Sequence, residues 1–121
     1  MGIALEDVRD LRTWLAAVGD IGELHVLTGA DWDLEIGAAS EVNYRRPAPM
    51  ALLFDEIDGY RPGLRVPSGS MSNARRLGLT LRLGTDLDDR ALVQALRSRP
   101  AEWIANADKF PARTRRCHRG S

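Results

Sequence analysis

A Gly/Ser loop that leads into a helix carries the side chains whose types and spacing come closest to a binding site. The loop is Pro67-Ser68-Gly69-Ser70, and Arg75 and Arg76 follow in the first turn of a helix predicted over residues 73–83. Backbone N–H groups at a helix start and arginine side chains both favour anions, so a phosphate site is one interpretation. The segment lacks the Gly-Lys-Ser/Thr of a P-loop and the three glycines of a dinucleotide fingerprint. Capping of the helix by Ser72 is the preferred interpretation.

Acidic side chains gather at two other places. Asp31, Asp33 and Glu35 alternate with other residues, but the glycine and the distal glutamate of a calcium loop are missing. We interpret them as charges at the start of a helix, with Asp31 or Asp33 as the N-cap. Asp55 and Glu56 end a predicted strand. Paired carboxylates can perform acid–base chemistry, but no His or Lys accompanies them in the sequence, so solvated strand-end charge is preferred.

The histidines and the single cysteine form no recognisable metal motif. His25 has no cysteine, aspartate or second histidine at ligand spacing, and we expect it on the surface of a strand. Cys117 and His118 are neighbours and cannot bind a metal by themselves. The sequence therefore predicts no catalytic, cofactor-binding or metal-binding residue in this chain. One cysteine excludes an internal disulfide, so we expect a reducing compartment and a cytoplasmic location.

The overall composition is that of a small globular domain. The 121 residues contain 17 basic and 17 acidic side chains, which give a formal net charge of +0, and 44% are hydrophobic. This balance does not favour a nucleic acid or an anionic membrane as partner. The residues 113–119 hold four arginines and offer a nucleic-acid-binding alternative. A solvated, disordered tail over 111–121 is the preferred interpretation, which leaves one domain over 1–110. The sequence has neither a signal-peptide pattern nor a long apolar run.

Hydrophobic periodicity predicts an α/β (α+β) fold with a small mixed β-sheet and about four helices packed on it. We expect Asp7 to cap the first helix and Asp86 the last, and Trp14 to lie at the edge of the core rather than act as a stacking platform. The run from Met50 to Ile57 suits a central strand covered on both faces. The predicted helices span 7–18, 34–44, 73–83 and 87–98, and the predicted strands span 24–27, 50–57 and 64–66.

Four motifs follow one another along the chain. They are Asp10-Leu11-Arg12 with Leu15 and Gly22-Glu23-Leu24; Asp31-Trp32-Asp33-Leu34-Glu35-Ile36; Ala51-Leu52-Leu53-Phe54-Asp55-Glu56 with Gly59-Tyr60; and Arg75-Arg76-Leu77. Their order and spacing resemble the N-terminal domain of UbiD-family decarboxylases, the enzymes that use prenylated FMN. The resemblance covers roughly residues 10–96. It implies a non-catalytic domain that packs beside a flavin domain, in an enzyme that reversibly decarboxylates aromatic or α,β-unsaturated acids.

The sequence also departs from the family pattern, so some family properties cannot be assigned to its residues. The family's flavin-binding barrel, its metal and phosphate ligands and its Glu-Arg-Glu catalytic set follow the region covered here, and none of these motifs exists in this sequence. Glu56 stands where the family commonly has Asn. At Pro111 the chain changes to the arginine-rich segment, which a frameshift, a truncated gene or a genuine stand-alone protein would each explain.

The sequence therefore predicts an N-terminal domain or fragment of a UbiD-type carboxy-lyase that is inactive alone. Prenylated FMN, a divalent metal and a monovalent cation are expected only in a full-length family member. The alternative is a stand-alone accessory subunit that docks on a separate catalytic UbiD-like chain. A homo-oligomer is the other partner that we consider.

Overall fold

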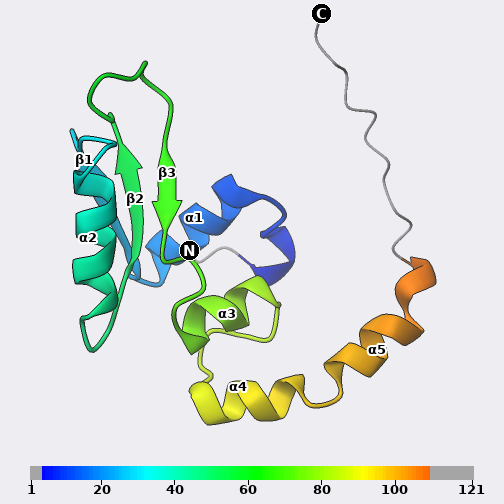
Figure 1. The fold of residues 1–121 in the computed structure, drawn as a ribbon. Coiled ribbons are helices and arrows are strands. Elements are labelled where there is room, and N and C mark those ends of the chain that lie inside the picture. Colours follow the sequence, from blue (N-terminus) through cyan, green and yellow to red (C-terminus); the bar gives the residue numbers. More distant parts are fainter. Residues whose placement is uncertain (1–3, 110–121) are drawn as a thin grey trace, which may run out of the picture.

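A three-stranded mixed sheet with helices on both faces forms the body of the protein, as a computed structural model that describes residues 4–109 shows (Figure 1). The strands are β1 (Leu24–Thr28), β2 (Ala51–Asp55) and β3 (Val66–Ser68), in the order β1-β2-β3. β1 pairs parallel to β2, and β2 pairs antiparallel to β3. The helix α2 (Glu35–Tyr44) connects β1 to β2. The predicted mixed α/β class is confirmed, and the predicted segment 111–121 lies outside the described residues.

The central strand β2 builds a core on each of its two faces. On one face, Ala51 and Leu53 pack against Trp14 and Val18 of α1 (Leu11–Asp20). Leu79 of α3 (Ala74–Thr80) belongs to the same cluster. Alternate residues of β2 face the other way because side chains of a strand alternate between faces. There, Leu52 and Phe54 pack with Ile57 and with partly buried residues of β1 and α2, which are Leu27, Ile36 and Ala39. The prediction of a central strand covered on both faces is confirmed.

The N-cap of the first helix lies three residues later than the sequence suggested. Asp7 ends a short 3-10 turn, η1 (Leu5–Asp7), and Asp10 is the N-cap of α1. The Asp10 carboxylate accepts from the Thr13 backbone N–H at 2.8 Å, and the Thr13 hydroxyl accepts from the Asp10 N–H, which is a reciprocal capping box. Leu11, expected in the apolar stripe, is 52% exposed. Trp14 is buried, so its predicted core position is confirmed.

Other helix boundaries also differ from the predicted caps. Asn73, not Ser72, caps α3, and Asp88, not Asp86, caps α4 (Asp89–Leu96). In both cases the true cap places its side-chain oxygen at the backbone N–H of the third helical residue. α2 starts after Leu34 without a side-chain cap. The predicted and the observed caps are short polar residues only one or two positions apart, so both fit the sequence pattern. Only the backbone geometry shows which of the two is the cap.

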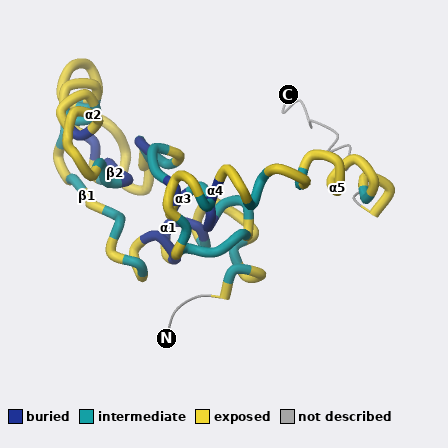
Figure 2. The backbone as a smooth tube through the Cα atoms, turned by 90° about the horizontal axis from the view of Figure 1, so that it is seen from below, coloured by how far each residue is buried: buried dark blue, intermediate teal, exposed yellow. Residues whose placement is uncertain are grey.

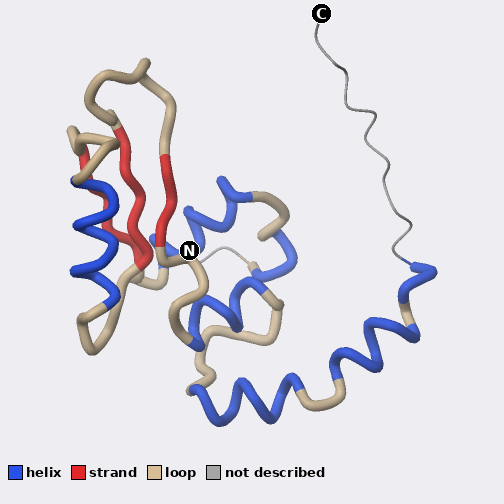
Figure 3. The backbone as a smooth tube through the Cα atoms, viewed as in Figure 1, coloured by secondary structure: helices blue, strands red, loops and turns tan. Residues whose placement is uncertain are grey.

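The last helices run away from the sheet. α4 is followed by α5 (Arg99–Ala105) and a 3-10 turn, η2 (Ala107–Lys109), and the three form an arm in Figure 3. Figure 2 shows the α5 segment largely exposed. Trp103 and Ile104 are 47% and 78% exposed, so this segment leaves two large apolar side chains accessible. Pro100 lies in the first turn of α5, where its missing N–H costs nothing.

Gly78 should be the glycine whose replacement damages this fold most directly. A Cβ at Gly78 would collide with the backbone carbonyl oxygen of Gly84, whereas a Cβ at Gly37 in α2 would meet no atom within 4 Å. We expect Gly78→Ala to lower the free energy of unfolding by about 1–3 kcal/mol through overpacking. Gly37→Ala, the matched control, should raise it by about 0.5–1 kcal/mol through helix propensity. Urea unfolding measures both, and equal stabilities of the two variants would contradict the packing argument.

The Asp10 cap should make α1 sensitive to acid. The hydrogen bond from the Thr13 backbone N–H, followed by that from the Thr13 hydroxyl, lowers the pKa of the Asp10 carboxyl below its usual value. A lowered folded-state pKa means that the stabilisation is present above the unfolded pKa and is lost as the pH falls through the folded one. Asp10→Ala should therefore destabilise the protein at neutral pH, and the difference from the natural protein should shrink below about pH 4. Thermal unfolding across pH measures this, and a pH-independent difference would count against it.

Candidate functional site

The buried guanidinium of Arg76 is the most unusual polar feature of the domain. Its side chain is fully buried at the start of α3. Nη1 donates to Glu23 Oε2 at 2.7 Å, and Nη2 donates to the Pro49 carbonyl oxygen at 2.9 Å and to the Ser72 hydroxyl. Arg76 Nε is the one buried side-chain nitrogen or oxygen in the described part of the chain without a hydrogen-bond partner. A buried arginine paired in this way is part of the core.

Glu23 collects three donors from α3. Besides Arg76, Arg75 Nη1 lies 3.3 Å from Glu23 Oε1, and Asn73 Nδ2 donates to Glu23 Oε2 at 2.9 Å. Arg75 Nε also donates to the Thr85 carbonyl oxygen at 3.1 Å. Arg75 and Arg76, which the sequence suggested as phosphate ligands, are therefore both paired with the Glu23 carboxylate. The phosphate interpretation of this helix start is not supported by its geometry.

The Gly/Ser loop before α3 serves packing. Gly69 is buried with φ +71°, and a Cβ there would lie 3.0 Å from the Met50 carbonyl oxygen. That carbonyl accepts from Asn43 Nδ2 at 2.8 Å, and the Met50 N–H donates to Asn43 Oδ1 at 3.0 Å. The Ser72 hydroxyl donates back to the Gly69 carbonyl oxygen. The Ser68 and Ser40 hydroxyls are 2.9 Å apart, so the loop lies against α2.

The acidic residues singled out in the sequence have local structural roles. Asp31 Oδ1 accepts from the Asp33 N–H, and Glu35 Oε2 accepts from the Asp31 N–H at 2.8 Å. Asp55 Oδ1 accepts from the N–H of Glu56, whose φ is +47°. Among residues 4–109 no group of three or more His, Cys, Asp or Glu side chains could hold a metal ion.

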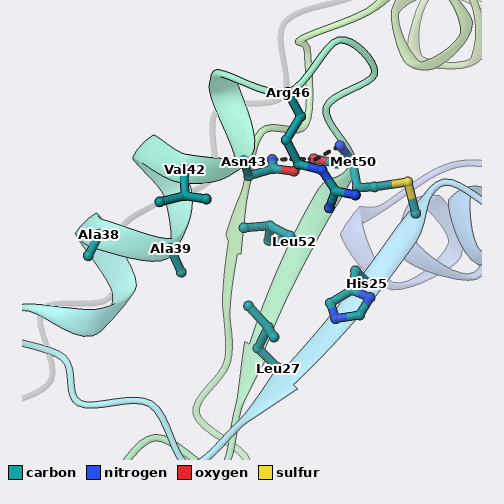
Figure 4. A pocket seen from close by; sticks show the side chains of 9 residues that line it. All are labelled: His25, Leu27, Ala38, Ala39, Val42, Asn43, Arg46, Met50 and Leu52. Carbon is teal, nitrogen blue, oxygen red and sulfur yellow. Dashed lines mark hydrogen bonds between the residues drawn. The ribbon is translucent and has the colours of Figure 1, made fainter.

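A shallow apolar groove between α2 and the sheet is the candidate site that remains. Its volume is about 350 Å³, within the usual range for ligand pockets. Leu27 and Leu52 form its floor on the sheet, and Val42, 65% exposed, lies on its rim in α2 (Figure 4). His25 of β1 and Arg46 after α2 supply polar atoms at the groove. His25 is exposed as predicted, and no acid or nucleophile lines the groove with it, so this surface is suited to contact rather than catalysis.

An exposed aromatic pair was missed by the sequence analysis. Trp32 and Tyr60 are 58% and 50% exposed, and their rings meet edge to face with centroids 6.5 Å apart. They follow β1 and β2, and the bridge between Asp31 and Asp58 holds the two segments together. Parallel strands bring their carboxyl ends to one sheet edge, which is the signal that could have placed these aromatic residues side by side.

The described residues contain no helix long and apolar enough to cross a membrane. The groove, the aromatic pair and the exposed residues of α5 place apolar side chains on the surface of the described part of the chain. Exposed apolar side chains gathered in this way mark interaction sites.

Comparisons with known proteins agree on the fold. A family model described as the 3-octaprenyl-4-hydroxybenzoate carboxy-lyase N-terminal domain matches residues 15–96. No curated protein is significantly similar in sequence. The open form of vanillic acid decarboxylase from Sedimentibacter hydroxybenzoicus, with truncated ShVdcD, matches with a TM-score of 0.67 at 22% identity, over 74% of this chain and 19% of that chain. The closed form matches with a TM-score of 0.56 at 22% identity, over 84% and 20%. This chain thus spans about a fifth of the length of these structures.

Breaking the Glu23–Arg76 pair should cost a large part of the folding free energy. Glu23→Ala leaves a buried guanidinium without its carboxylate, and we expect a loss of about 3–5 kcal/mol. The matched control is Glu41→Ala, which removes the exposed partner of Arg45, 2.7 Å away on α2. That loss should stay within about 1 kcal/mol. Chemical denaturation measures both. Similar losses of unfolding free energy in the two variants would show that the buried pair stabilises the domain no more than the exposed pair does.

Proposed function

Because this chain belongs to the UbiD family, in the part that the family's N-terminal domain forms, we propose that it serves as a non-catalytic module of a UbiD-type carboxy-lyase. The module supplies a folded surface beside a catalytic domain that binds the cofactor. In the full-length enzyme, prenylated FMN supplies the chemistry of reversible, non-oxidative decarboxylation of aromatic or α,β-unsaturated acids. This chain's residues provide structure and contact surfaces.

The proposal rests on the pairing of the two arginines at the start of α3 with one carboxylate. Arg76 is buried and bound to Glu23, and Arg75 is bound to the same carboxylate. A site that grips a flavin phosphate needs cations and N–H groups free to face the ligand. Arg75 and Arg76 instead connect α3 to Glu23 at the start of the sheet, which is a structural role.

Exposed apolar side chains on α5 favour a polypeptide as the partner of this module. Trp103 and Ile104 are exposed on α5, whose main contacts in the described part of the chain are with its neighbours α4 and η2. Exposed large apolar residues that gather on one element usually contact another polypeptide. The partner is either a catalytic domain in the same longer chain or, as the alternative, a separately encoded UbiD-like chain on which this module docks as an accessory subunit. A cytoplasmic location fits both arrangements.

The proposal predicts that this chain alone does not retain the cofactor. Purified protein incubated with prenylated FMN and then desalted should show no flavin absorption, because Arg75 and Arg76 are paired with Glu23 and a phosphate site needs cations that face the ligand. A full-length UbiD-type enzyme treated in the same way is the positive control and should keep a stoichiometric flavin spectrum. Stoichiometric flavin on this chain would overturn the non-catalytic assignment.

A further inference from the structure

β1 is an open edge of the sheet without the usual protection against pairing. The strand order β1-β2-β3 leaves the outer backbone groups of β1 without a strand partner among the described residues. Proteins commonly protect such edges with charged side chains, prolines or bulges. The other edge strand, β3, carries Pro67, whereas β1 consists of Leu24-His25-Val26-Leu27-Thr28 and has no proline, lysine, arginine or acid.

We propose that β1 is an interface between two copies of this chain, in which the two β1 strands pair antiparallel around a two-fold axis that passes beside Val26. The result is one continuous six-stranded sheet. This inference is independent of the catalytic assignment, since it concerns a surface that the module presents whether or not a flavin domain is attached. A two-fold axis requires a self-complementary surface, and β1 satisfies that requirement on both faces of the sheet.

On the α1 face of the sheet the pairing buries Val26. Leu24 packs against the cluster of Trp14 and Val18, and Val26 lies on the same face because it is two residues further along the strand. Val26 is 50% exposed in one copy. At the two-fold axis each Val26 meets the other directly, and a cross-strand pair of β-branched residues stabilises a sheet.

On the α2 face the pairing closes the groove. His25 and Leu27 line the groove beside the open edge (Figure 4). An antiparallel register centred on Val26 sets Leu27 of the second copy opposite His25. The second copy thus supplies an apolar wall to the groove on the side that α2 leaves uncovered. No charged side chain of β1 opposes a like charge, which removes the usual obstacle to edge pairing.

The charges of α2 favour the same arrangement. A two-fold axis perpendicular to the sheet places both α2 helices on one face and antiparallel to each other. Each helix starts with Glu35, preceded by Asp33, and ends before Arg45 and Arg46. Arg45 is paired with Glu41 of its own helix, so Arg46 is the cation of this end that faces the acidic start of the other helix across the closed groove. Such complementarity sets orientation more than affinity, and salt should weaken it modestly.

The expected dimer is weak and depends on concentration. A pair of five-residue strands makes few hydrogen bonds, and its interface falls at the small end of specific interfaces. Sedimentation velocity over a series that extends to millimolar protein should show a monomer–dimer equilibrium. Val26→Lys places like charges at the two-fold axis and should weaken association by at least about tenfold. The matched control Val66→Lys alters the other edge at a residue of similar exposure, 39%, and should leave the equilibrium unchanged.

Two further measurements keep the test decisive. Val26→Thr retains the β-branched shape and removes apolar surface, so it should weaken association less than lysine does and serves if the lysine variant fails to fold. Amide hydrogen exchange of β1, measured at low and high concentration, should slow only at high concentration, while exchange in β3 stays constant. A monomer at every concentration, a dimer that Val26→Lys leaves intact, or a dimer that Val66→Lys dissolves would each overturn the proposal.

Discussion

The buried ion pair between Glu23 and Arg76 is the constraint on which the rest of the domain depends. Glu23 precedes β1, and its carbonyl oxygen also accepts the Ala51 N–H, so one residue holds the starts of the two parallel strands and the helix α3. The Arg76 carbonyl accepts the Thr80 hydroxyl at 2.7 Å, and Thr80 accepts the Trp14 indole N–H at 2.9 Å. A chain of polar contacts thus runs from α1 through α3 to the sheet. Within this network both Nη atoms of Arg76 are hydrogen-bonded inside the protein, whereas Arg76 Nε has no partner. Hydrogen bonds of this kind are stronger in the protein interior than in water.

This inward use of charge explains why the domain resembles a scaffold. Arg76 at the start of α3 is turned into the core, and the exposed Arg75 is paired with the same Glu23 carboxylate. The surface offers apolar side chains in the groove beside α2, in the Trp32–Tyr60 pair and on α5. Apolar surfaces gain free energy when another polypeptide covers them. A module built in this way contributes to an enzyme through contact, and the open edge of β1 extends that principle to association between copies.

Sequence reasoning worked best where one periodic signal dominates. The apolar run of β2 required burial on both faces, and the structure places it at the centre of the sheet. It worked least well for helix starts, because several short polar residues compete for each cap and the difference between Asp7 and Asp10 lies in the reciprocal bonds of Thr13. It also could not foresee the exposed arm. Leu92 of α4 is buried, but Val93 of α4 and Trp103 and Ile104 of α5 stay exposed in the described part of the chain.

The sequence by itself determined the kinds and order of the elements and the family, because periodicity and motif spacing are local properties of the chain. The tertiary structure decided what the polar residues do. Arg76 in a helix start is equally compatible with a phosphate and with a carboxylate 53 positions earlier in the chain, and only the packing of α3 against the loop before β1 brings Glu23 within 2.7 Å. Contacts between residues that distant depend on the path of the whole backbone, which no local pattern encodes.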